Sequence, residues 1–112
     1  MLICEAGDVT IVPFPFTDMA VAKPRPALAL SSQKANGESG NTIFAMITTA
    51  AKSHWPTDVP LADAETTGLT AASLVRLKLF TLDNRLVARK IGTLSPRDRT
   101  SVRKMLRAVV GV

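Results

Sequence analysis

Apolar and polar residues alternate along much of this chain, which is typical of β-strands that bury one face. The predicted strands are Asp8–Phe14, Ala27–Leu30, Thr42–Thr49, Val59–Leu61, Ser73–Asp83 and Leu86–Leu94. In the longest strand, Val75 and Leu77 share one face. Arg76 and Lys78 share the other. The segment Gln33–Asn41 contains an Asn-Gly and a Ser-Gly pair, so it is predicted to be a turn-rich hairpin connection.

The hydrophobic period changes after Ser95, and the new spacing predicts one α-helix at the C-terminal end. Ser95 suits the N-cap, Pro96 the first helical position and Asp98 the acidic position of a capping box. The apolar stripe of this helix consists of Val102, Met105, Leu106, Val109 and Val110. A different face carries Arg99, Arg103 and Arg107. We expect the stripe to cover the open side of a small, strongly bent antiparallel sheet or barrel.

Length and composition favour one soluble, cytoplasmic domain that spans residues 1–112. No continuous apolar run has membrane-spanning length, and the first residues combine an early Glu5 with no basic segment. We therefore expect no membrane contact. Cys4 is the single cysteine and lies far from the single histidine, His54, so no metal-ligand spacing is present. We expect neither a metal nor a cofactor.

Charge is distributed unevenly along the chain. Ten of the fourteen basic residues, but two of the nine acidic ones, lie from Arg76 onward. This asymmetry favours a polyanionic partner, RNA or DNA, on one side of the fold. The alternative is a solvated basic helix face.

Arg25 is the strongest candidate for specific chemistry. Pro24 and Pro26 flank it and hold its backbone extended, so its guanidinium is presented from a restrained position. A fixed, planar, permanently charged group suits recognition of phosphate or carboxylate. A solvated turn arginine is the alternative.

Five sequence blocks occur in an order that resembles the PemK/MazF family of toxin endoribonucleases. They are GDVTIVPFPFTD, KPRPALALS, the strand that ends in Ile47-Thr48-Thr49, SLVRLKLFTLD and GTLSPRD. The resemblance implies an SH3-like antiparallel β-barrel with a C-terminal helix, mainly β with some α. It also implies a type II toxin that forms homodimers, cleaves single-stranded mRNA without a metal and is inhibited by a cognate antitoxin.

The resemblance assigns roles to individual residues. Arg25 matches the family's catalytic arginine, and Thr48 matches its catalytic threonine, with Thr49 in place of a serine. Because arginine stays protonated, we expect Arg25 to stabilise negative charge and to donate a proton, and not to act as the base. Counting back from Asp83, Leu77 replaces a carboxylate that several members carry, which leaves catalytic competence open.

The remaining site expectations concern RNA contacts and the general base. The expected RNA-binding residues are Arg76, Lys78, Lys23, Thr49 and Trp55. Trp55 stacks on a base or closes one end of the barrel. His54 is a possible base, with a solvated loop histidine as the alternative. The rival function is a non-catalytic barrel that binds nucleic acid or an antitoxin, and Leu77 is the residue that favours it.

Overall fold

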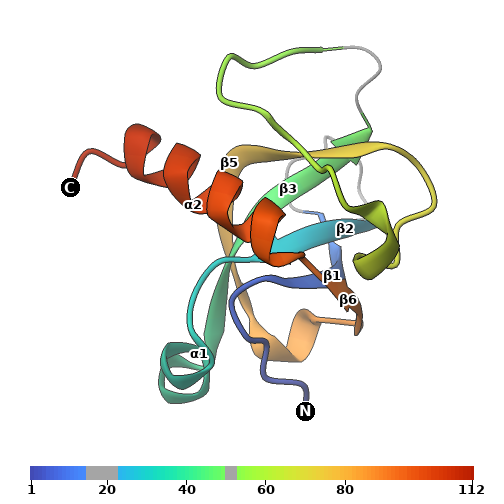
Figure 1. Ribbon diagram of the computed structural model, residues 1–112. Helices are drawn as coiled ribbons and strands as arrows, with labels where there is room; N and C mark the ends of the chain where they lie inside the picture. Colours follow the sequence, from blue (N-terminus) through green and yellow to red (C-terminus); the bar gives the residue numbers. More distant parts are fainter. Residues whose placement is uncertain (15–22, 50–52) are drawn as a thin grey trace.

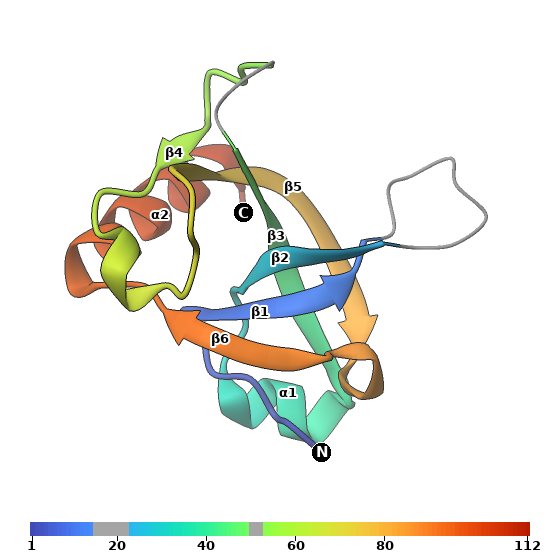
Figure 2. The same cartoon turned by 90° about the vertical axis from the view of Figure 1, so that its right-hand side faces the viewer.

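A six-stranded antiparallel sheet curls into a half-barrel, and α2 packs across one side of it (Figures 1 and 2). The computed structural model describes residues 1–14, 23–49 and 53–112. Within them the strands are β1 (Asp8–Pro13), β2 (Pro24–Ala29), β3 (Asn41–Thr49), β4 (Val59–Pro60), β5 (Ser73–Asp83) and β6 (Arg89–Thr93), in the order β4-β5-β3-β2-β1-β6. The helices are α1 (Gln33–Ser39) and α2 (Pro96–Val109), and short 3-10 turns form η1 (Ala64–Thr66) and η2 (Asn84–Leu86). The prediction of a small, mainly β barrel with a C-terminal helix is confirmed.

Both faces of the sheet are buried, each against a different apolar cluster. We call the first the α2-side cluster; its members include Val9, Leu28, Ala45, Ile47, Val75, Leu77 and Val102. We call the second the N-terminal cluster; it comprises Cys4, Val12, Phe14, Ala27, Ala29, Phe44 and Phe80. Successive strand residues alternate between the two clusters, as the period of two requires.

The segment predicted to be a turn-rich hairpin connection does join the antiparallel neighbours β2 and β3, but it forms helix α1, so the prediction of turns is wrong. The Ser32 hydroxyl caps it by accepting a hydrogen bond from the Ala35 N–H at 3.2 Å, and Gly40 ends it with a φ of 74°. Asn36 is fully buried, and its Nδ2 donates to the Cys4 carbonyl at 2.8 Å. A residue type that usually marks a turn here joins the helix to the N-terminal segment.

The last strand begins later than predicted, because η2 occupies the residues before it. Asn84 is buried: its Oδ1 accepts from the Thr42 hydroxyl at 2.7 Å, and its Nδ2 donates to the Asn36 carbonyl at 2.8 Å. These bonds hold the chain in a 3-10 turn where the pattern predicted a strand from Leu86. β6 therefore covers Arg89–Thr93.

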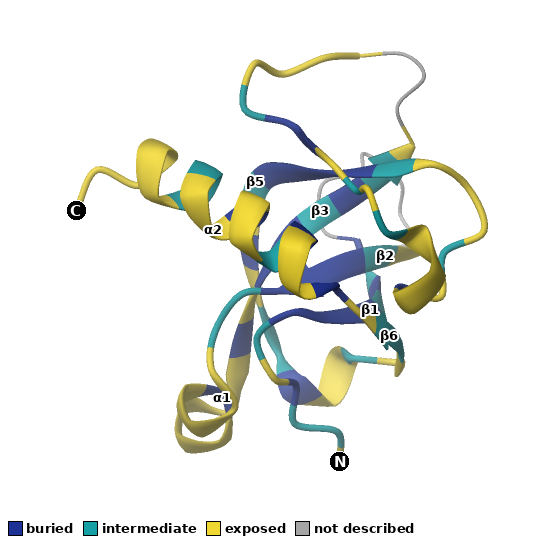
Figure 3. Cartoon of the chain, in the orientation of Figure 1, coloured by how far each residue is buried: buried dark blue, intermediate teal, exposed yellow. Residues whose placement is uncertain are grey.

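Helix α2 begins as predicted, but only its first half covers the sheet. The Ser95 hydroxyl accepts from the Asp98 N–H at 3.1 Å, which confirms the cap. Val102 is buried and Leu106 partly so, whereas Val109 is 44% exposed and Val110 40% exposed. Figure 3 shows the exposed end of α2 projecting beyond the sheet, so the expectation that Val109 covers the open side is wrong.

The carboxylate of Asp98 does not close a capping box on its own helix. It accepts hydrogen bonds from the Ala62 and Asp63 N–H groups, both at 3.0 Å, and is almost fully buried. Asp98 therefore ties the start of α2 to the segment after β4. Among the described residues, neither helix has the length and apolar character needed to cross a membrane.

Candidate functional site

Arg25 is the second residue of β2, opposite Val12 of β1. It is exposed, and within the described parts of the chain its guanidinium has neither a hydrogen-bond nor an ion-pair partner. Pro26 restricts Arg25 to extended conformations, and Pro24 and Pro26 each have a fixed φ and lack the N–H donor of an ordinary ladder residue. Among the described residues, the guanidinium of Arg25 is therefore accessible to an anion, and the alternative of a solvated arginine has the same exposure.

Thr48 lies near the end of β3, half-buried, and the next residue, Thr49, is exposed. The ladder between β2 and β3 ends at the pair Ala27–Met46. Two more residues in that register would bring Arg25 opposite Thr48, on the face of the N-terminal cluster. The pairing between β2 and β3 stops before this point, so Arg25 and Thr48 lie beyond the ladder, at the same end of the two antiparallel strands.

Arg76 is not an exposed phosphate ligand but a buried anchor. It is 7% exposed, and its guanidinium makes four hydrogen bonds. Nε and Nη2 donate to the two carboxylate oxygens of Asp58 at 3.0 and 2.9 Å. Nη1 and Nη2 donate to the hydroxyl and the carbonyl of Ser53 at 2.9 and 3.1 Å. The hydrogen bonds from Arg76 are the main reason why the pKa of Asp58 lies below its usual value.

This ion pair holds the loop that follows β3. The Asp58 N–H donates to the Trp55 carbonyl at 3.0 Å, and the Asp58 carboxylate accepts from the Trp55 N–H at 2.9 Å. The Arg76 Cζ lies 5.1 Å from the centre of the Trp55 ring, a cation–π distance. Trp55 nevertheless remains 37% exposed, and neighbouring His54 is exposed.

Asp58 is the residue that sequence reasoning missed. Its local signature is the turn Trp55-Pro56-Thr57-Asp58, in which proline takes the position that suits its fixed φ. Nothing in that signature identifies Arg76 as the partner, because the pair is made across the fold. Trp55 itself packs on Arg76 and belongs to neither apolar cluster, so its ring does not close the barrel core.

The other candidate residues lie at different depths. Lys23 is exposed just before β2, and its carbonyl accepts from the Phe14 N–H at 3.2 Å. Lys78 is half-buried on β5. Leu77 is 8% exposed within the α2-side cluster, on the opposite face of the sheet to Arg76. Across residues 1–14, 23–49 and 53–112, no group of three or more His, Cys, Asp or Glu side chains has the arrangement of a metal site.

Comparison with known proteins agrees with this architecture. Residues 5–110 match the family described as PemK-like, MazF-like toxin of type II toxin–antitoxin system. MazF from Deinococcus radiodurans is 23% identical, with a TM-score of 0.78 and full coverage of both chains. A chain of the MazE–MazF crystal structure from the same organism (form III) is 25% identical, with a TM-score of 0.79 and 99% coverage of each chain.

A more distant structure is an endoribonuclease in complex with its cognate antitoxin from a mycobacterial species. It is 17% identical, with a TM-score of 0.77 and coverage of 97% of this chain and 96% of that one. A search of curated protein sequences finds no match.

Proposed function

Because the chain belongs to the PemK-like, MazF-like family of toxins of type II toxin–antitoxin systems, we propose that it is an endoribonuclease that cleaves single-stranded mRNA without a metal ion. The observation that carries this proposal is the exposed guanidinium of Arg25, which has no partner among the described residues and lies at the end of β2 beyond its ladder with β3. A free cation on a stiff strand suits a phosphodiester in the transition state, where negative charge increases.

The chemistry requires three tasks. The 2′-hydroxyl of RNA must lose a proton and attack the adjacent phosphorus, the resulting negative charge must be stabilised, and the departing 5′-oxygen must gain a proton. We assign charge stabilisation and donation to Arg25, and positioning of the scissile phosphate to the Thr48 hydroxyl. His54 is the candidate base, because the Asp58–Arg76 pair anchors the loop that carries it.

RNA contacts beyond the cleaved bond are assigned by exposure. Lys23 and Thr49 are exposed at this end of β2 and β3, and the half-buried Lys78 lies on β5, which pairs with β3. Trp55 offers the exposed part of its ring for base stacking. Arg76 is assigned a positioning role in place of the phosphate contact expected from the sequence, because it is buried and four of its five N–H donors already have acceptors.

The alternative function, a non-catalytic barrel that binds nucleic acid or an antitoxin, rests on Leu77. A carboxylate at position 77 would lie among aliphatic side chains under α2, away from the face that carries Arg76. The neutral Leu77 suits this apolar cluster, and the cleavage assay decides between the two functions.

The experiment is an incubation of the purified protein with a long single-stranded RNA in EDTA. Arg25→Ala should lower the cleavage rate by about 10²–10³, the usual cost of one preorganised stabilising group. Arg89→Ala removes an equal charge from exposed β6 and is the matched control. Its rate should stay close to that of the parent. His54→Ala tests the base: a loss as large as that of Arg25→Ala assigns it, and retained activity removes it. RNA that stays intact with the parent in EDTA would overturn the metal-independent proposal.

We also propose a cognate antitoxin and a homodimer. Structural relatives are crystallised as MazE–MazF complexes. At the exposed end of α2, Leu106, Arg107, Val110 and Val112 surround a hollow, and such apolar surface is typical of an interface. Light scattering after gel filtration should give twice the chain mass, and Val110→Glu should shift it towards the monomer.

A further inference from the structure

One buried side chain joins helix α1 to the rest of the molecule. The helix covers Gln33–Ser39, and Asn36 is the only one of these residues that is buried. The Asn36 Nδ2 donates to the Cys4 carbonyl at 2.8 Å and to the Ser31 carbonyl at 3.1 Å, and its Oδ1 accepts from the Ser31 hydroxyl. The Asn36 carbonyl accepts from the Asn84 Nδ2 at 2.8 Å. Asn36 therefore connects α1 to the N-terminal segment, to the residues after β2 and to η2.

The residue after Asn36 is a glycine that the fold does not require. Gly37 has no positive φ, and among the described residues a Cβ added there would meet only the Ile3 side chain, at 4.0 Å. Glycine inside a helix also lowers its stability relative to alanine. Asparagine deamidates most readily before glycine, because no Cβ hinders the approach to the glycine nitrogen. The pair Asn36-Gly37 therefore has a chemical property that neither packing nor backbone conformation explains.

Deamidation would involve these two residues and water. The backbone nitrogen of Gly37 attacks the Asn36 Cγ, its proton passes to Nδ2, the bond between Cγ and Nδ2 breaks, and ammonia leaves. The remaining five-membered succinimide is opened by water at either carbonyl, which gives aspartate or isoaspartate at position 36. No atom is oxidised or reduced, and water is the only co-reactant.

The closed helix opposes this attack. In an α-helix the N–H of Gly37 is directed at the carbonyl four residues earlier, and ψ at position 36 is held near about −42°. Ring closure requires Asn36 to leave that ψ, and its side-chain hydrogen bonds to Cys4 and Ser31 must break. An isolated helix as short as α1 is marginal in water, so we expect α1 to open locally while the sheet stays folded.

We propose that Asn36 and Gly37 form a deamidation site that acts when α1 opens, and that the product releases the N-terminal segment, residues 1–6, from the fold. An aspartate at position 36 has no donor for the carbonyls of Cys4 and Ser31, and burial of its charge is unfavourable. Isoaspartate adds one carbon to the main chain and disrupts the helix. The conversion is one-way, so it marks each molecule in which α1 has opened. This inference does not depend on the proposed nuclease activity.

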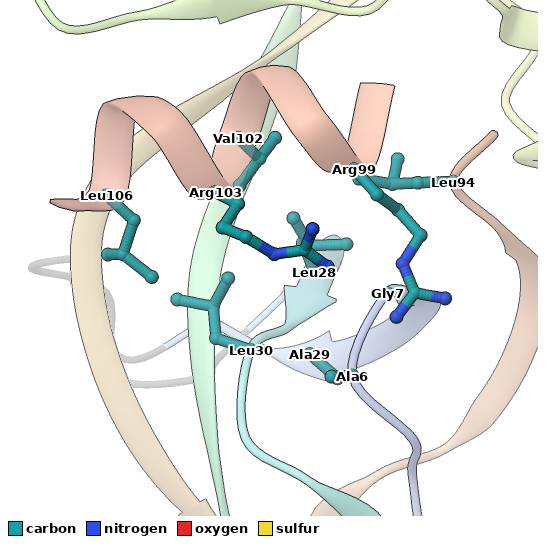
Figure 4. Close-up of a pocket in the computed structure, with 10 residues that line it drawn as sticks. All are labelled: Ala6, Gly7, Leu28, Ala29, Leu30, Leu94, Arg99, Val102, Arg103 and Leu106. Atoms are coloured by element: carbon teal, nitrogen blue, oxygen red, sulfur yellow. The ribbon is translucent and has the colours of Figure 1, made fainter. Parts of the chain in front are cut away.

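The release should stop at Gly7, which is held on both sides. Its N–H donates to the Ala29 carbonyl at 2.8 Å, and its carbonyl accepts from the Leu94 N–H at 2.9 Å. Arg99 of α2 lies against Gly7, beside the pocket that both residues line (Figure 4). Cys4 precedes this anchor and is fully buried, and burial is the main reason why the pKa of its thiol lies above its usual value. Release should therefore expose Cys4 and make it reactive.

The first test follows the parent protein in native buffer and in guanidinium chloride, by intact mass and by peptide mapping at Asn36, Asn41 and Asn84. Position 36 should convert at least about tenfold faster in denaturant, because molecules with α1 open are a small minority in native buffer. Gly37→Ala keeps the asparagine and fits the available space. It should slow conversion in denaturant by about tenfold or more, because the added Cβ hinders the attack.

A second variant tests whether α1 is the element that opens. Ser32→Ala removes the hydroxyl that accepts from the Ala35 N–H, and it leaves Asn36 and Gly37 unchanged. Loss of a helix cap should speed conversion in native buffer by about fivefold. Ser101→Ala removes an exposed hydroxyl from α2 and is the matched control, with the rate of the parent expected.

The effect of the product is measured by the labelling of Cys4 with a maleimide fluorophore in native buffer. Asn36→Asp should label about tenfold or more faster than the parent. Asn41→Asp adds an equal charge at an exposed position and should label at the rate of the parent. Ion exchange also separates converted parent protein by its additional negative charge, so the same measurement does not depend on a variant that folds.

Four outcomes would overturn the proposal. The first two are equal conversion in native buffer and in denaturant, and conversion mainly at Asn41 or Asn84. The third is a rate in native buffer that Ser32→Ala does not raise above that of Ser101→Ala. The fourth is unchanged labelling of Cys4 in the separated fraction, which would show that the product leaves the N-terminal segment in place.

Discussion

The buried ion pair between Arg76 and Asp58 should contribute more to stability than an exposed pair of the same kind in this chain. The Arg76 and Asp58 side chains are 8% and 1% exposed. Arg85 and Asp83 form a second two-bond pair, at 3.1 and 2.8 Å, but these side chains are 75% and 37% exposed. The two pairs share their chemistry and their two-bond geometry, and they differ in burial and in the two further hydrogen bonds that Arg76 donates to Ser53.

Asp58→Asn places an amide where a carboxylate neutralised Arg76. The guanidinium stays in a site with little access to water, and an amide N–H faces one of its donors. Breaking one partner of a buried pair costs about 3–5 kcal/mol of unfolding free energy. Domains of this size have about 5–15 kcal/mol in total, so the variant should lose a large share of its stability. The melting temperature should fall by about 10–20 °C.

Asp83→Asn is the matched control and should melt close to the parent, because water screens and replaces the lost interaction. Urea titrations of both variants give the free energies, and similar slopes with denaturant show that the unfolded states are comparable. Trp55 is the single tryptophan and packs on Arg76, so its fluorescence also reports whether the loop has loosened before the fold is lost.

A double variant tests whether the uncompensated charge of Arg76 causes the loss of stability. In Asp58→Asn with Arg76→Met, the uncompensated charge is gone, and the protein should be more stable than Asp58→Asn alone. Equal losses in Asp58→Asn and Asp83→Asn would refute the argument that burial makes this pair important. A double variant no more stable than the single one would refute the role of the stranded charge.

Four further predictions concern the acid stability of the fold, the tether made by Asp98, the packing of α2 and the cleavage of RNA. Because Arg76 lowers the pKa of Asp58, the unfolded state takes up this proton first as pH falls; the stabilisation present above about pH 4 should disappear at lower pH, and acid titrations of Asp58→Asn should show a shallower loss. Asp98→Ala should destabilise the fold by about 1–3 kcal/mol, because the part-buried N–H groups of Ala62 and Asp63 lose their acceptor, and a calorimetric change within error of zero would contradict the tether. Leu106→Ala should cost less than the roughly 2–5 kcal/mol of a full core leucine, because Leu106 is only partly buried, and thermal melts test this. Thr48→Ala should slow RNA cleavage sharply while binding of uncleavable RNA weakens much less, and non-additive losses with Arg25→Ala would show that the two act as one unit.

The sequence by itself determined most of the strands and the position of α2. The alternation of apolar and polar residues predicted both ends of β5 correctly. A shift of the strand by one residue would turn every apolar side chain to the other face of the sheet. Ser95 and Pro96 marked the start of α2 because capping is a local interaction. The motifs around Arg25 and Thr48 indicated the family, which the match over residues 5–110 confirms.

The tertiary structure decided what the polar residues do. Asn36 and Asn84 resemble turn residues in the sequence, but each is buried and bonded to backbone or side chains more than thirty residues away. Arg76 alternates with apolar neighbours as an exposed strand residue would, yet Asp58 neutralises it inside the fold. Periodicity records which side of an element faces the core, because that depends on neighbours in sequence. Whether a buried polar group finds its partner depends on segments that only folding brings together.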